Sequence, residues 1–342
     1  MAATSHQLLS AALNGGLVLP DVMDKIWNIS NIPLVLTDLC AKGTHSNRKA
    51  EFTVDELATQ VSNNAAVEGA DVTRIDNVLS KREGNYTQIA TKGVKMTDTA
   101  EVANSIGGVG HAAYQLKERQ KELKRDIEAQ MCSHQASVAG DASSVAGISA
   151  GIGAQLKTNV KFGATGAVGG FNYSTGLYVA PTPGTKRALS ETLIRDVLQD
   201  IYVAGGNTSL LMARPVVIRK LSEYLFTSTA RVATLTSEQE QNSPSALTAY
   251  GSVNVMVTDF GQTVQMRDNR LQLVDTTATS SMYFIDPSKL KQSFMRGVQA
   301  ERLAKTGLSD SWMLSAQYSF LIMAEKSQGA ILAIDEALSV VA

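Results

Sequence analysis

Alternating apolar and polar residues predict three short strands in the first third of the chain. The alternation is clearest over 49–54 and returns around 86–89 and 93–96. Between them, 62–85 is polar and has few large apolar residues. A long segment without a core of its own is generally functional or held by a partner. We therefore expect a long hairpin loop that projects from the body.

The strongest helical pattern covers about 100–132. Positions at alternating steps of three and four residues form a narrow, mostly apolar seam: Val109, Ala113, Leu116, Gln120, Leu123, Ile127 and Met131. Beside it run a basic column and an acidic column: Lys117, Lys121 and Arg125, then Glu118, Glu122 and Asp126. Such columns form either a solvated face or a surface that meets complementary charges on adjacent subunits.

Spacing along these columns has opposing effects on helix stability. Like charges four residues apart weaken a helix by a few tenths of a kcal/mol per pair. The pairs Glu118–Lys121 and Glu122–Arg125, three residues apart, are expected to offset part of that loss.

Two segments show no regular pattern. In 1–33, small apolar patches are separated by Asn14-Gly15-Gly16, which predicts an arm that lies on another surface. The Gly-, Ala- and Ser-rich segment 133–184 is expected to be an extended, flexible ribbon that crosses a subunit surface. A nucleotide-binding loop is disfavoured, because no G-K-[ST] triplet follows these glycines and Leu156 stands where the dinucleotide fingerprint needs Gly or Ala.

A compact α/β unit follows. Ser190 can cap a helix that ends at Gly205-Gly206, 210–213 reads as a strand, and Pro215 suits the first turn of a second helix. The first helix has an apolar face made of Leu193, Ile194, Val197, Leu198 and Ile201.

The last third is expected to be mostly strand. Residues 227–250 are rich in Ser and Thr and read as a loop. Val253, Val255 and Val257 then alternate, Gly261 turns the chain, and Val264 and Met266 resume the alternation. Further strands are expected at 281–285 and 312–323.

Composition narrows the classes of function. The chain has 342 residues, of which 44% are hydrophobic and 18% charged, below the roughly 25% charged residues of soluble domains. Such low charge fits either a large core or a surface covered by partner subunits. A net charge of -1 and a pI near 6.4 are unlike a dedicated nucleic-acid binder.

Candidate chemistry is sparse. Cys40 and Cys132 are expected to be free thiols, and no cofactor or metal site is expected, because the four histidines are scattered: His6, His45, His111 and His134. Residues 1–27 lack the features of a signal peptide and no stretch reaches the length of a membrane span, so we expect a protein without a membrane partner, made in a cytoplasm.

The order of these elements resembles the Hong Kong 97-type capsid proteins of tailed bacteriophages, an α+β fold with N-terminal arm, extended loop, spine helix, peripheral domain and axial domain. Five motifs carry the resemblance to a phage capsid family formerly of unknown function: 85–89 with 92–94, 122–128, 198–206, 257–261 and 303–307. The implied division is arm 1–39, extended loop hairpin 40–99, peripheral domain with spine helix and ribbon 100–187, axial domain 188–261, and peripheral C-terminal strands 262–342.

That resemblance implies a major capsid protein, a virion component assembled in the host cytoplasm. Copies would form pentamers and hexamers, then an icosahedral head with a portal at one vertex, around double-stranded DNA bound without sequence specificity. A separate scaffolding protein and decoration proteins are implied partners. Loop charges are expected to meet the helix charges of a neighbour, which gives these contact residues: Arg74, Asp76, Arg82, Glu83, Lys117, Glu118, Lys121, Glu122, Arg125 and Asp126.

Three alternatives remain open at this point. An encapsulin-type shell shares the same fold. An enzyme could use the α/β unit at 189–226, although no G-x-S-x-G, no H-E-x-x-H and no convergent acid, base or nucleophile is visible. A surface adhesin is disfavoured by the lack of a secretion signal.

Overall fold

The computed structural model describes residues 33–57, 60–69, 71, 80–103, 111–141, 143–227, 255–273, 279–305 and 307–341. As far as described, they form two compact units: unit 1 holds 92–121 and 300–314, and unit 2 holds 33–91, 122–299 and 315–341. The expected arm up to residue 32, and most of the expected loop at 227–250, lie outside the described residues.

A six-stranded sheet forms the centre of unit 2. Its strand order is β5-β14-β11-β8-β10-β9, with β8 parallel to β10, β5 parallel to β14 and the other neighbours antiparallel. Every residue of β8, β11 and β14 is buried. The strands are β5 (Val160–Lys161), β8 (Leu210–Ala213), β9 (Val255–Val257), β10 (Thr263–Asp268), β11 (Ser280–Ile285) and β14 (Gly329–Ile334).

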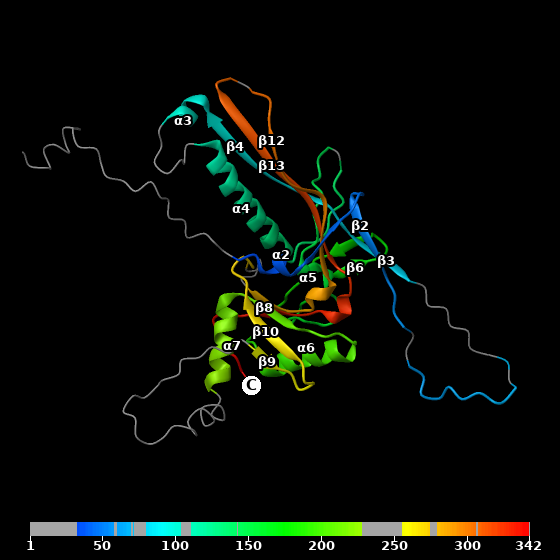
Figure 1. Ribbon diagram of the computed structural model, residues 1–342. Coiled ribbons are helices and arrows are strands. Elements are labelled where there is room, and N and C mark those ends of the chain that lie inside the picture. Colours follow the sequence, from blue (N-terminus) through cyan, green and yellow to red (C-terminus); the bar gives the residue numbers. More distant parts are fainter. Residues whose placement is uncertain are drawn as a thin grey trace, which may run out of the picture. The chain divides into compact units, whose positions relative to one another are not determined.

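Helices α6 (Glu191–Val203) and α7 (Pro215–Thr227) pack on this sheet (Figure 1). The Ser190 hydroxyl accepts a hydrogen bond from Leu193 N at 3.3 Å, and Gly205 takes a φ of +84° after the helix, as glycine readily does. The caps, the two helices and strand β8 confirm the sequence prediction. The buried faces of both helices share one apolar core with the sheet: Ile194, Val197, Ile201, Val217 and Leu221 meet Leu211, Val264, Met282, Phe284 and Ile331.

The expected boundary between axial domain and C-terminal strands, at 261/262, runs through this sheet. Strands β10, β11 and β14 follow the boundary in sequence, yet β10 and β11 both pair with β8, and β14 pairs with β11. The domain division therefore stays a prediction about the assembled protein, whereas the sheet itself draws on both segments.

The long helix is shorter than expected. Residues 98–102 form a separate short helix, α3 (Asp98–Val102), and α4 (Ala112–Met131) begins only at residue 112. Residues 104–110, which include Val109 of the expected seam, lie outside the described residues. The seam is confirmed in its second half only: Leu123, Ile127 and Met131 are buried, whereas Ala113 and Gln120 are exposed.

A second sheet has the order β1-β12-β13-β4, in which β1 is parallel to β12. Strand β13 corresponds to the strand expected at 312–323 and begins slightly earlier. Strand β12 was not predicted from the pattern. Their bounds are β1 (Ala41–Thr44), β4 (Gln88–Thr97), β12 (Leu290–Arg302) and β13 (Ser309–Ile322).

The extended loop hairpin begins with two paired strands, β2 (Lys49–Val54) and β3 (Lys81–Tyr86), which are antiparallel. Residues 81–85 were expected within the polar loop, and that assignment is wrong. Pairing with β2 overrides their polar character, and Gly84 and Asn85 are buried.

The Gly-rich segment is not a flexible ribbon on the surface. It contains the short helix α5 (Ile152–Gln155) and a hairpin of β6 (Gly170–Asn172) and β7 (Leu177–Val179), and residues 149–156 are buried. Asn85 Oδ1 accepts from Ala150 N at 2.9 Å, so polar groups are satisfied inside the protein. A Cβ at Gly151 would lie 2.2 Å from the Ser133 carbonyl oxygen, so this close approach requires glycine.

Short segments complete the fold. They are α2 (Val35–Leu39) and the 3-10 turns η2 (Pro287–Lys289) and η3 (Glu325–Ser327). Among the described residues, no helix combines the length and the apolar character that crossing a membrane requires.

Candidate assembly sites

The described part of the extended loop exposes apolar side chains. Leu57 is 96% exposed, Val67 80% and Val61 46%. Figure 1 shows this part of the chain extending away from the rest of unit 2. Since water-exposed apolar side chains gathered in one segment mark interaction sites, the loop is a candidate surface for a partner.

At the base of the loop, the described candidate charges contact groups of the same chain. Arg82 Nε lies 3.7 Å from Glu51, and the Tyr173 hydroxyl donates a hydrogen bond to Glu83. Arg74 and Asp76 lie outside the described residues. The expected pairing of Arg82 and Glu83 with a neighbour's helix stays a prediction.

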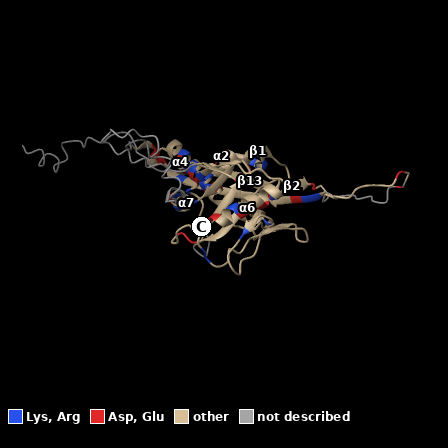
Figure 2. Cartoon of the chain, turned by 90° about the horizontal axis from the view of Figure 1, so that it is seen from below, with Lys and Arg blue, Asp and Glu red and all other residues tan. Residues whose placement is uncertain are grey.

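Along α4, basic and acidic residues are interspersed (Figure 2). Lys121 Nζ and Glu118 Oε1 are 2.8 Å apart, which confirms the expected pair three residues apart. Lys117 and Asp126 are exposed, whereas Glu122 and Arg125 are half-buried. Their contact with an adjacent subunit also stays a prediction.

A buried carboxylate joins three segments of unit 2, and the sequence pattern did not reveal it. Glu128 is fully buried on α4. Its oxygens accept from the backbone N–H groups of Leu36 and Thr37, both at 2.7 Å, from the Thr37 hydroxyl at 2.5 Å and from Asn269 Nδ2 at 2.9 Å. With these donors, the buried charge is well satisfied. Nothing in the sequence separates Glu128 from the other acidic residues of the same helix, which are exposed or half-buried.

Both cysteines lie close to this carboxylate; they are free, as expected, and they are also buried. Cys132 Sγ is 3.9 Å from Glu128 and 3.2 Å from Asn269 Nδ2. Burial raises the pKa of Cys40 to about 12 and that of Cys132 well above its usual range. They are therefore inert thiols rather than reactive ones.

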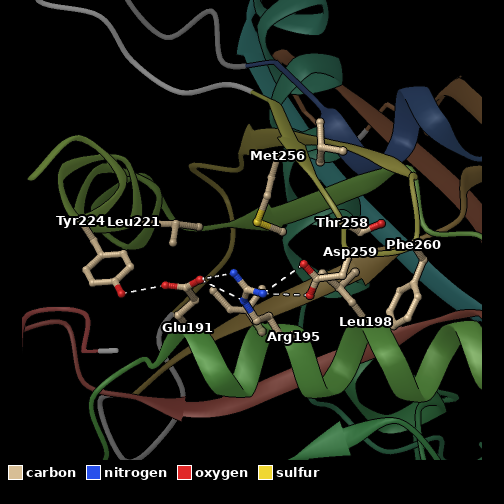
Figure 3. Close-up of a pocket in the computed structure, with 11 residues that line it drawn as sticks. Glu191, Arg195, Leu198, Leu221, Tyr224, Met256, Thr258, Asp259 and Phe260 are labelled. Atoms are coloured by element: carbon tan, nitrogen blue, oxygen red, sulfur yellow. Dashed lines mark hydrogen bonds and ion pairs between the residues drawn. The ribbon is translucent and has the colours of Figure 1, made fainter. Parts of the chain in front are cut away.

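A pocket lies in unit 2 between α6, α7 and β9 (Figure 3). Arg195 crosses it: Nη1 donates to both Asp259 oxygens, at 3.0 and 2.9 Å, and Nη2 donates to Glu191 at 2.6 Å. The Tyr224 hydroxyl donates to the other Glu191 oxygen at 2.7 Å. The two carboxylates raise the pKa of Arg195, and the Glu191 carboxylate raises that of Tyr224. Arg195 thus links α6 to the β9–β10 turn through paired charges.

Beside this pocket the turn carries exposed aromatic surface. The rings of Tyr202 and Phe260 stack with centroids 4.6 Å apart and an interplanar angle of 6°, and these side chains are 47% and 40% exposed. Val203 and Val257 are 78% and 67% exposed. The site thus combines paired charges in the pocket with exposed apolar side chains beside it.

The part of the chain that the structure describes brings together no group of three or more His, Cys, Asp or Glu side chains able to hold a metal ion.

The same fold occurs in solved protein shells. The capsid of a native GTA particle matches with a TM-score of 0.59 at 12% identity, over 97% of this chain and all of the other. The SrpI encapsulin of Synechococcus elongatus PCC 7942 matches with a TM-score of 0.54 at 10% identity, over 98% of each chain. The protein therefore has the α+β, Hong Kong 97-like capsid fold, as expected.

Within that fold, the chain belongs to the SU10 major capsid protein family, whose family model matches residues 3–335. The major capsid protein of Escherichia phage Phieco32 is 26% identical over 293 residues, which cover 77% of this chain and 79% of that protein. The protein is thus a phage major capsid protein, a structural component that assembles with copies of itself into a shell. The encapsulin match, at 10% identity, concerns the fold alone.

Proposed function

We propose that the protein assembles through pentamers and hexamers into an icosahedral phage head around double-stranded DNA, with the extended loop of each copy lying on a neighbour's spine helix, α4. The exposure of Leu57, Val61 and Val67 carries this proposal. When a partner removes the apolar side chains of a projecting loop from water, the free energy falls and the contact is stabilised. In a protein that builds a shell from itself, the neighbouring copy is the fitting partner.

The remaining partners follow from the same proposal. One vertex would hold a portal, a separate scaffolding protein would guide assembly, and decoration proteins could bind outside. Packaged DNA would be held without sequence specificity, in keeping with a net charge of -1. The protein would have no catalytic role, and assembly would take place in the host cytoplasm before the protein becomes part of the virion.

Electron microscopy of the purified full chain, with sedimentation velocity, tests shell formation. We expect closed shells or rings of five and six subunits, whereas a monomer or dimer under every condition would contradict the proposal.

The loop contact is tested with Leu57→Asp, which places a charge where burial is proposed. We expect this variant to fold and to lose most of its closed shells. Leu273→Asp is the matched control, because Leu273 is 70% exposed and lies outside the loop; it should assemble normally. Normal shells from Leu57→Asp would refute the loop contact while leaving shell formation itself intact.

A further inference from the structure

An aromatic cluster lies against the base of the extended loop. On the β6–β7 hairpin, the Phe171 ring makes edge-to-face contacts with Tyr173 and Tyr178, at centroid distances of 5.1 and 5.0 Å. Tyr178 is only 2% exposed, whereas Tyr173 is 53% exposed at the rim of the cluster. Edge-to-face pairs of this kind stabilise beyond the area they bury.

Charged residues from both loop strands meet this cluster. Lys49 Nζ on β2 lies 5.2 Å from the Phe171 ring centre, and Lys81 Nζ on β3 lies 5.6 Å from that of Tyr173. The Tyr173 hydroxyl donates to Glu83, also on β3. These cation–π and hydrogen-bond contacts hold each strand separately. We call Phe171, Tyr173, Lys49, Lys81 and Glu83 the loop clamp.

The other side of the loop clamp rests on buried structure. Phe171 and Tyr178 pack with Ala150 and Ala154, which are fully buried. Tyr178 N donates to the Ser137 hydroxyl at 2.7 Å, and Ser137 N donates to the Tyr178 carbonyl at 3.1 Å. The hairpin is thus fixed to the core of unit 2 rather than to the loop alone.

The orientation of the base of the loop determines the position of its far end. The loop has about 12 residues between Val54 and Val67, and a fully extended chain of that length would span up to about 40 Å. A turn of about 5° at the base would then move the far end by about 3 Å, enough to break any specific contact there. Glu56 adds an ion pair with Lys326 where the loop begins.

We propose that the loop clamp positions the extended loop and thereby sets the angle at which neighbouring copies join. The role rests on the proposed contact between loop and neighbour. The residues of the loop clamp hold the loop in place, whereas other residues of the loop touch the neighbouring copy. Loss of the loop clamp therefore alters the shape of the shell more than the stability of the subunit.

Full-length variants test this role through particle diameters in electron microscopy and amide exchange of 81–86. Phe171→Leu removes the ring, and we expect mixed diameters and open shells, with exchange about fivefold faster. Tyr173→Phe removes only the hydroxyl and should change the diameters and the exchange rate in the same direction, but less. If Phe171→Leu does not fold, Tyr173→Phe is used for the test instead. Phe171→Tyr keeps the ring face and should restore shells of the original size.

Tyr318→Phe is the control for stability alone. Its hydroxyl donates to Gln130 at 3.1 Å in the core, and neither residue belongs to the loop clamp, so it should lower the unfolding midpoint and leave the diameters unchanged. Unaltered diameters in Phe171→Leu, or equal changes in Tyr318→Phe, would overturn the positioning role. Failure of the proposed loop contact is recognised separately, by normal shells from Leu57→Asp.

Discussion

Single residues matter most where charge is buried. Through one carboxylate, Glu128 joins the backbone of Leu36 and Thr37, the end of α4 and the segment after β10. Each donor that it satisfies would otherwise be left without a partner away from water, at a cost of about 1–3 kcal/mol. The attachment of residues 33–39 to the body therefore combines this carboxylate with the burial of Val35 and Leu36.

Replacing this carboxylate with its amide tests that dependence. In Glu128→Gln, an NH2 group would face N–H donors, so we expect the free energy of unfolding to fall by about 3 kcal/mol in urea titrations of the unassembled subunit. Glu301→Gln is the matched control, because Glu301 is exposed on β12 and its change should leave the midpoint in place. A Glu128→Gln midpoint equal to that of the unaltered protein would contradict this account.

Elements were predictable where local signals and burial agree. Helix α6 has a Ser cap, α7 has a Pro at its first turn, and both have one apolar face, whereas β8 is wholly apolar and β10 alternates. Strand β3 was missed because Lys-Arg-Glu-Gly-Asn is polar, and only pairing with β2 makes it a strand. The role of Glu128 was invisible for a related reason: residues 36 and 269, which contact it, lie far away in sequence.

The ion pair between α6 and the β9–β10 turn should contribute little to stability. Arg195 and Asp259 have side chains that are 56% and 59% exposed, so water screens their attraction. A double-mutant cycle with Arg195→Met and Asp259→Asn should give a coupling free energy of about 0.5 kcal/mol in thermal unfolding. A value of about 2 kcal/mol or more would mean that the pair is shielded from water in solution.

On the scale of the whole molecule, the near balance of charge bears on assembly. A net charge of -1 spread over 342 residues produces little mutual repulsion between copies. We therefore expect the yield of closed shells, measured by sedimentation, to change less than about twofold between about 50 and about 500 mM NaCl. Loss of shells at low salt would instead point to like charges facing each other across the interfaces.

The central sheet also has a consequence for synthesis. Strand β5 pairs with β14, about 170 residues later in the chain, and β14 lies between β5 and β11. On the ribosome, a growing chain therefore lacks an inner strand of its main sheet until β14 has emerged. Nascent chains crowded on one messenger RNA cannot present finished subunits to each other, so translation itself delays shell building until each subunit is complete.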